Sequence, residues 1–184
     1  MIWNWQRPEW PDFTWNPGLF RRAEEQFLLG GGVFVGTFNH LGADDRDQLT
    51  IEALSIEALT TSEIEGEVLD RASVQSSIRR QLGLGTDQRR VKPAEQGIAE
   101  MTVDLYRSFD KPLSDGVLFG WHRMLTNGRR DIRNIGGYRT HDEPMQIVSG
   151  ALHDPKVHFE APPSAIVPRE MKNRRCPGAR RKPF

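Results

Sequence analysis

The sequence predicts a mainly α-helical protein that carries one short β-hairpin. Two observations indicate the helices: apolar residues recur at helical spacing up to Gly136, and glycine, proline and capping residues divide this region into segments. A third observation indicates the hairpin. After Gly136-Gly137 the helical period is lost, and short runs rich in β-branched and aromatic residues follow, separated by turn residues.

The first sixteen residues are rich in tryptophan and are interrupted by Pro8 and Pro11. Because proline opposes helix formation, we expect an irregular or short β segment whose indole rings pack on the helices. An aromatic cage for a ligand is the alternative interpretation. We favour packing, because buried aromatic rings mostly belong to a core.

The next segment predicts a helix with Pro17 in its first turn. Its apolar residues share one stripe: Leu19, Phe20, Ala23, Phe27 and Leu28. The triplet Gly30-Gly31-Gly32 predicts a break in this helix, because each glycine lowers helix stability by about 1 kcal/mol relative to alanine. The triplet is not a phosphate-binding loop, since no Lys-Ser/Thr pair follows it.

The stretch of residues 49–69 contains the predicted central helix, which Asp44 or Asp45 could cap at its start. Its apolar residues lie on more than one side, so we expect burial on several faces. Thr61 and Glu65 are four residues apart and share a face at the helix end, where Gly66 can adopt the left-handed conformation that stops a helix. A core helix with a solvated last turn is the simplest interpretation of this pattern alone.

Three further helices are predicted after Asp70, at Pro93 and after Ser114. The apolar residues expected to face inward are Val74, Ile78 and Leu82; Ile98, Met101, Leu105 and Phe109; and Val117, Leu118, Trp121 and Leu125. Gly83, Gly85 and Asn127-Gly128 are the expected stops. His122 lies beside the third stripe, and we interpret it as structural because no His or Cys lies at metal-ligand spacing from it.

The hairpin is predicted from two short strands, Met145 to Val148 and Val157 to Phe159, with Ser149-Gly150 as the turn. Pro162-Pro163 is expected to end it. Ser164 is then expected to cap a last helix that contains Ile166, Val167 and Met171.

The composition excludes several classes of protein. The formal net charge is +0, which gives no indication of nucleic acid or a membrane as partner. Cys176 is the single cysteine, so the chain has no internal disulfide and no cysteine metal cluster. The N-terminus lacks the layout of a signal peptide, and no apolar run reaches the length of a membrane span. We expect a cytoplasmic protein; the sequence leaves its oligomeric state open.

The segment Thr61-x-x-x-Glu65-Gly66 resembles the inhibitory motif Ser/Thr-x-x-x-Glu-Gly/Asn of Fic proteins, which transfer AMP from ATP to hydroxyl side chains of proteins. The wider context, from Thr61 to Asp70, resembles the Fic subgroup that carries an N-terminal extension and the inhibitory helix in one chain. The resemblance implies a Fic-like helical bundle fragment in which Thr61, Glu65 and Gly66 form the inhibitory motif.

Later segments resemble the same family in the same order. Leu118 to His122 resembles the helix that precedes the family's hairpin, or flap, and residues 157–163 resemble the sequence that follows it. The residues that resemble the flap are Tyr138, Arg139, Met145, Gln146, Ile147 and Val148. In the family this flap holds the target protein by backbone pairing, and adding a strand to an exposed sheet edge demands little of the bound sequence.

The family's catalytic signature, His-Pro-Phe-x-x-Gly-Asn-Gly-Arg, is missing. The chain has five histidines, none followed by Pro-Phe: His40, His122, His141, His153 and His158. Asn127-Gly128-Arg129 lacks the upstream histidine and precedes the flap, whereas the family's signature follows it. We therefore predict no catalytic residue and no metal ligand here, and no cofactor in this chain, although the complete family uses ATP and Mg²⁺.

The resemblance covers residues 1–168. From Arg169 onward, seven basic residues stand against one acidic residue, without an apolar period. A frame change or early stop near Met171 is our expectation for this tail, and a natural basic tail for an acidic partner is the alternative. The predicted parts are a Trp-rich extension with the first helix (1–43), the N-terminal part of a Fic-like core (44–168) and the basic tail (169–184).

Two functions follow from the resemblance. The first is an N-terminal fragment of a Fic-type AMP-transferase that is inactive alone. The second is a non-enzymatic module that supplies its Glu65 helix to a separate Fic enzyme. The partners would be a target protein or a Fic core. In the family the inhibitory glutamate pairs with an arginine of the catalytic signature; because that signature is missing, we expect Glu65 to be solvated and its helix partly uncovered.

Overall fold

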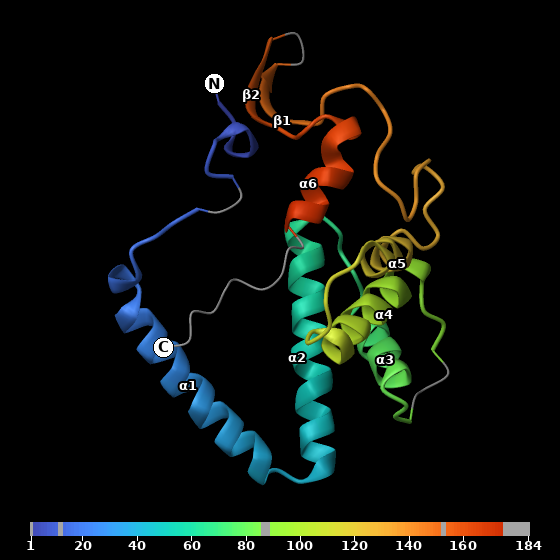
Figure 1. The fold of residues 1–184 in the computed structure, drawn as a ribbon. Helices are drawn as coiled ribbons and strands as arrows, with labels where there is room; N and C mark the ends of the chain where they lie inside the picture. Colours follow the sequence, from blue (N-terminus) through green and yellow to red (C-terminus); the bar gives the residue numbers. More distant parts are fainter. Residues whose placement is uncertain (1, 11–12, 86–88, 152–153, 175–184) are drawn as a thin grey trace. The chain divides into compact units, whose positions relative to one another are not determined.

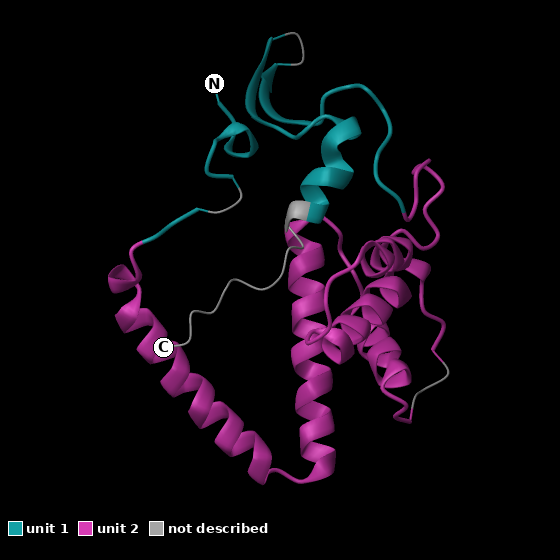
Figure 2. Ribbon diagram, in the orientation of Figure 1, with its two compact units in different colours: residues 1–15, 137–184 teal, residues 16–136 magenta. Residues whose placement is uncertain are grey.

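The computed structural model describes residues 2–10, 13–85, 89–151 and 154–174. It is mainly α-helical with one small antiparallel sheet of two strands, which confirms the predicted class (Figure 1). The chain divides into two compact units, one of residues 16–136 and one that joins residues 1–15 to residues 137–184 (Figure 2). We describe each unit by itself.

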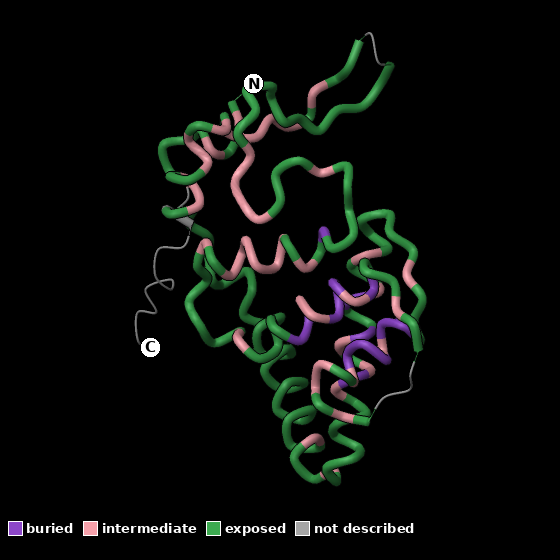
Figure 3. The backbone as a smooth tube through the Cα atoms, turned by 90° about the vertical axis from the view of Figure 1, so that its right-hand side faces the viewer, coloured by how far each residue is buried: buried purple, intermediate pink, exposed green. Residues whose placement is uncertain are grey.

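The unit of residues 16–136 contains the helices α1 (Arg21–His40), α2 (Ala43–Ile64), α3 (Arg71–Gln81), α4 (Pro93–Ser108) and α5 (Asp115–Leu125). Helices α2, α3 and α4 pack on one another, and α5 packs on α4. The core lies among α2, α3 and α4 (Figure 3). Its buried apolar residues are Ile51, Ala58, Val74, Ile78, Ile98, Ala99 and Val103.

Helix α1 runs without interruption through Gly30, Gly31 and Gly32, so the predicted break is wrong. Glycine lowers helix stability but can adopt helical backbone angles, and here the apolar residues on both sides continue the helix. Pro17 does not begin α1; it begins a separate 3₁₀ turn, Pro17–Leu19. No residue of α1 is buried.

The N-cap of helix α2 is Gly42, so the prediction of Asp44 or Asp45 as the N-cap is wrong. Both carboxylates lie in the first turn, where the helix dipole favours negative charge. Burial is limited to the side that faces the core. Leu49 and Ile56 remain 46% and 49% exposed, so burial on several faces is not found for this helix.

The predicted start and stop of α3 are confirmed. The Asp70 carboxylate accepts a hydrogen bond of 2.8 Å from the Ser73 N–H, and Gly83 has a φ of 79° at the stop. For α4 the predicted inward stripe is only partly right, since Ile98 is buried but Phe109 is exposed. Arg107 donates a hydrogen bond to the carbonyl of Gln81, which is the last residue of α3. Phe109, two residues further along, therefore lies beyond the end of α3.

Helix α5 has its predicted cap, because the Ser114 hydroxyl accepts a hydrogen bond of 3.3 Å from the Val117 N–H. None of its apolar residues is fully buried, and Leu125, which we expected to face inward, is exposed. Helix α5 packs mainly on α4, so it covers the bundle from one side and leaves its own outer surface open.

The other unit contains the hairpin, formed by strands β1 (Gln146–Ala151) and β2 (Asp154–Glu160) with an irregularity between Ile147 and Val148. Ser149-Gly150, the predicted turn, lies inside β1, so this prediction is wrong. The antiparallel register extends past them to the pair Ala151 and Asp154, and Gly150 takes a φ of 96° within the strand.

The N-terminal tryptophans contact the hairpin as well as a helix, which corrects the expectation that they pack on helices. The Trp3 ring lies 5.7 Å from the Phe159 ring, and the Trp5 indole N–H donates to the Glu160 carbonyl at 2.8 Å. Trp10 donates to the Glu170 carboxylate of α6 (Val167–Arg174) at 3.1 Å. One edge-to-face ring contact and two indole hydrogen bonds therefore connect the N-terminal segment to the hairpin and α6.

The last helix does not begin at Ser164 as predicted. Ser164 starts a short 3₁₀ turn, Ser164–Ile166, and its hydroxyl donates to the His141 carbonyl at 2.6 Å instead of capping a helix. The predicted basic tail begins inside α6, and residues 175–184 lie outside the described part of the chain.

Candidate functional site

The end of α2 carries the predicted inhibitory motif and has a well-defined cap. Gly66 takes a φ of 83°, as its position after the helix predicts. The Gly66 N–H donates to the Glu63 carbonyl at 3.0 Å, and the Glu67 N–H donates to the Ser62 carbonyl at 2.8 Å. This pair of bonds is the Schellman motif, which requires a left-handed residue at the glycine position. The backbone that carries Glu65 is therefore fixed by local interactions.

The two side chains of the motif lie at the surface. Glu65 is exposed and forms no ion pair with any residue that the structure describes. The Thr61 hydroxyl donates to the Glu57 carboxylate at 3.3 Å, one turn earlier in the helix, and does not hydrogen-bond to Glu65. The Glu65 carboxylate is thus available to a cation from outside this unit.

An arginine near the motif is already engaged with other carboxylates. Arg129 donates two hydrogen bonds to Asp131, at 2.8 Å and 2.6 Å, and lies 3.6 Å from the Glu67 carboxylate. The hydrogen bond from Arg129 lowers the pKa of Asp131 to about 2, and the same contact raises the pKa of Arg129. Sequence reasoning did not find this cluster, because residues 67 and 129 are brought together only by the tertiary fold.

One side of the α2 end packs against the helical bundle. Ser62 and Glu67 border a small cavity of about 110 Å³, which also touches α4 at Ile98 and α5 at Leu125. Thr61 and Glu65 are not among its lining residues. The helix end therefore has one side that faces α4 and α5 across this cavity and another side that carries the two motif residues.

The hairpin places the predicted flap residues in the other unit. Gln146, Ile147 and Val148 lie in β1, all of whose residues are exposed. Among the described residues β1 pairs only with β2, so the outer edge of β1 keeps free backbone donors and acceptors. Such an edge can accept an extended peptide as an added strand.

The remaining flap residues lie beside the strand. The Met145 carbonyl accepts a hydrogen bond of 2.8 Å from the Ala161 N–H, which extends the pairing by one step. Arg139 donates to the Pro162 carbonyl and, at 3.7 Å, to the Met145 sulfur, while Tyr138 is half-buried. Arg139 thus links the entry and the exit of the hairpin.

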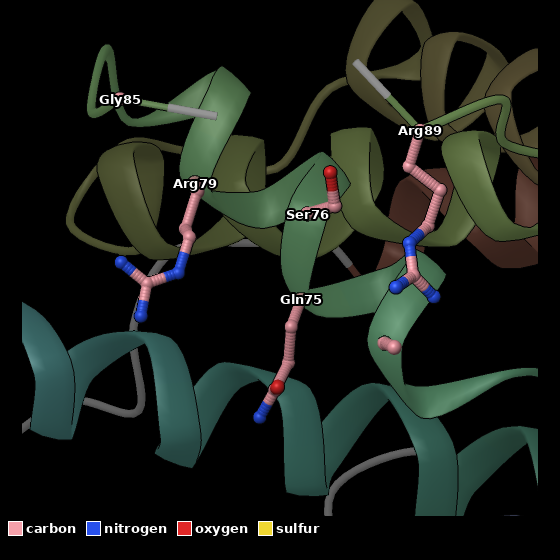
Figure 4. A pocket seen from close by; sticks show the side chains of 6 residues that line it. Gln75, Ser76, Arg79, Gly85 and Arg89 are labelled. Carbon is pink, nitrogen blue, oxygen red and sulfur yellow. The ribbon is translucent and has the colours of Figure 1, made fainter. Parts of the chain in front are cut away.

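A larger cavity, of about 390 Å³, lies beside α3 and is lined in part by arginine (Figure 4). Its arginines have partners: Arg79 donates to Gln48 of α2, and Arg89 lies 3.6 Å from the Asp70 carboxylate. Because both cations are engaged, we do not assign an anion site to this cavity. Gln75, in the same cavity, also extends to α2, where it donates to Glu52 at 2.8 Å.

The described residues provide no other candidate for chemistry. No group of three or more His, Cys, Asp or Glu side chains among them is placed to hold a metal ion. His122 accepts a hydrogen bond of 3.0 Å from the Gly136 N–H through Nδ1, which is a structural contact. None of the helices in the described ranges has both the length and the apolar character that a membrane span requires.

The exposure of Glu65 predicts how its replacement affects stability. Glu65→Gly should change the free energy of unfolding by no more than about 0.5 kcal/mol, since the carboxylate has no described partner. Gly66→Ala is the matched comparison: forcing a Cβ into the left-handed conformation costs about 1–2 kcal/mol. Urea titrations of the two variants check the pair, and a large loss for Glu65→Gly would show that Glu65 has a structural role.

Comparison with known proteins shows that part of the chain is similar to a family described as a domain of unknown function. No curated protein matches the sequence. Residues 3–84, less than half of the chain, match a family described as a domain of unknown function, DUF4172. This region runs from the Trp-rich segment through α1 and α2 to the end of α3, and so includes the Thr61, Glu65 and Gly66 motif.

Proposed function

We propose that the chain supplies the regulatory and target-docking parts of a Fic-type protein AMP-transferase and has no catalytic residue of its own. The end of α2 is the inhibitory element, the hairpin is the docking flap, and the general base and the ATP site belong to the catalytic part that carries the family's signature. ATP and Mg²⁺ would be bound there, not by this chain.

The observation that supports the inhibitory role most strongly is the state of Glu65. A carboxylate at the end of a helix, fixed by the Gly66 cap and free of described partners, can form an ion pair with an arginine that approaches it. In the family, such a pair between the glutamate and the signature arginine keeps the γ-phosphate of ATP from its productive position. Arg129 does not take this role here, because it is engaged with Asp131 and Glu67.

The docking role rests on the exposed edge of β1. Main-chain hydrogen bonds from a target segment would add a strand beside Gln146, Ile147 and Val148. Because these bonds use the target's backbone, the flap would accept different sequences that present a hydroxyl side chain.

A second candidate function uses the same residues in a separate polypeptide. The accessible Glu65 would also allow the chain to inhibit a Fic enzyme that lacks its own inhibitory helix. This function predicts that the wild-type chain, and not Glu65→Gly, lowers AMP transfer when added to such an enzyme. An equal effect of both proteins, or no effect of either, removes this candidate and leaves the first.

The purified chain should not transfer AMP. Neither the wild type nor Glu65→Gly should label itself or added proteins from radiolabelled ATP and Mg²⁺, because no histidine precedes Pro-Phe. A complete Fic enzyme with its inhibitory glutamate replaced serves as the positive control. Labelling by the Glu65→Gly chain above the level of heat-denatured protein would contradict the proposal.

A further inference from the structure

The proposed function leaves the apolar face of α1 unused. Phe27 and Phe34 are separated by seven residues, and with Phe20 and Phe38 they lie on one face of the helix. Phe27 is 77% exposed and Phe34 is 64% exposed. The rings of Phe34 and Phe38 stack at 5.9 Å, so they form one continuous apolar surface.

This face continues into a groove on the neighbouring helices. The groove has a volume of about 540 Å³ and is lined mainly by apolar side chains of α1, α2 and α4. Residues that line it include Phe34, Phe38, Leu49, Ile56 and Tyr106. The exposed apolar residues of α2 noted above thus belong to the same surface as the phenylalanines of α1.

The size of the surface indicates a protein partner. The exposed apolar side chains on this face of α1 and in the groove have roughly 800 Å² of surface available for burial. This sum takes about 150–250 Å² for each aromatic side chain. The largest apolar patch of an ordinary monomer is about 300–600 Å². A stable protein interface buries about 800 Å² on each partner, so the surface has the size that one such interface needs.

We propose that a second copy of this chain covers the surface, with the two α1 helices antiparallel around Gly31. Gly31 lies near the middle of α1, and a Cβ built there meets nothing within 4 Å. With a two-fold axis beside Gly31, Phe27 of each copy faces Val35 of the other, and Leu28 faces Phe34. Such a surface is self-complementary, as a two-fold interface requires.

The charges at the ends of α1 support the antiparallel arrangement. Arg21 and Arg22 lie in its first turn, and Asp44 and Asp45 follow shortly after its last turn. In an antiparallel pair the two arginines and Glu24 of one copy lie near His40 and the two aspartates of the other, so each end of α1 meets charges of the opposite sign. Opposite charges at an interface favour one orientation over its alternatives.

Analytical ultracentrifugation of the full chain tests the proposal. We expect a dimer at micromolar concentration for the wild type. Phe27→Glu with Phe34→Glu should raise the dissociation constant of the dimer at least about 100-fold, since buried aromatic residues dominate interface energies. Leu29→Glu with Val33→Glu, on the opposite face of α1, is the matched control and should remain dimeric. Circular dichroism confirms that both double variants are folded.

A crosslinking experiment tests the orientation of the helices. In a Cys176→Ser background, oxidation of an equimolar mixture of Glu24→Cys and Phe38→Cys chains should give the mixed dimer, and Glu24→Cys alone should give none. Preferential Glu24–Glu24 crosslinking would overturn the antiparallel arrangement. The dimer would be overturned by a monomeric wild type, including one that sediments with anionic lipid vesicles. It would also be overturned by association beyond the dimer, or by a control double variant that dissociates as much as the Phe27→Glu, Phe34→Glu variant.

Discussion

Gly97→Ala should destabilise the helical unit by at least about 2 kcal/mol, because it forces α4 away from α5. A Cβ built at Gly97 lies 1.9 Å from the Met124 carbonyl oxygen and 2.9 Å from its carbonyl carbon. Both are backbone atoms, so no side-chain rotation relieves the contact. The better helix propensity of alanine, about 1 kcal/mol, offsets only part of this cost.

The matched control for Gly97→Ala is Gly120→Ala in α5. A Cβ built at Gly120 meets nothing within 4 Å, so this variant should gain up to about 1 kcal/mol from helix propensity. Urea unfolding followed by circular dichroism compares both variants with the wild type. Equal stability of Gly97→Ala and the wild type would contradict the close packing of α4 on the end of α5.

Glu95→Ala should cost about 2–4 kcal/mol, because Glu95 is a buried carboxylate that connects two parts of the unit. Its side chain is 2% exposed. One carboxylate oxygen accepts from the Lys92 N–H at 3.1 Å at the start of α4, and the other accepts from the Asp70 N–H at 3.3 Å before α3. Removal of the carboxylate leaves two backbone donors without a partner and a cavity beside them.

Glu100→Ala in the same helix is the control for Glu95. Glu100 is half-buried and accepts from two side-chain amides, Gln96 at 2.8 Å and Gln81 of α3 at 3.4 Å, but from no backbone N–H, so its replacement should cost less than about 1 kcal/mol. Glu95→Gln keeps one acceptor oxygen and should fall between the two. A loss of stability for Glu95→Ala no larger than that for Glu100→Ala would show that the link from Asp70 to α4 contributes little.

The local features of this fold could be predicted from the sequence. The caps at Asp70 and Ser114 and the left-handed stops at Gly66 and Gly83 were predicted at the correct residues. These features depend on a few neighbouring residues, so the sequence contains the information that determines them. The same holds for the pairing of the strands that contain Ile147 and Phe159.

Features that depend on residues far apart in the sequence were missed. Burial along α2 and α4 depends on where the neighbouring helix ends, and the period alone does not show this. The contacts of Glu95 with Asp70 and of Arg129 with Glu67 join separate segments, and neither follows a local motif. For the candidate site, the backbone at Gly66 was predictable, whereas the engagement of the nearby Arg129 was not.

The inhibitory role of Glu65 is tested most directly by giving this chain the part that it is proposed to regulate. Residues 1–168 are joined to the catalytic half of a complete Fic enzyme, which carries the histidine, the phosphate-binding glycines and the signature arginine. We expect a low rate of AMP transfer for this chimera. Glu65→Gly should raise the rate at least about tenfold, which corresponds to about 1.4 kcal/mol, because the ion pair with the arginine is lost.

Glu63→Ala, which removes an exposed carboxylate two residues earlier in the same turn, is the control and should leave the rate unchanged. Circular dichroism and ATP binding establish that each chimera is folded. A rise in AMP transfer for Glu65→Gly alone is the predicted result. Equal rates for the wild type, Glu63→Ala and Glu65→Gly in folded, ATP-binding chimeras would contradict the assignment of the α2 end as an inhibitory element.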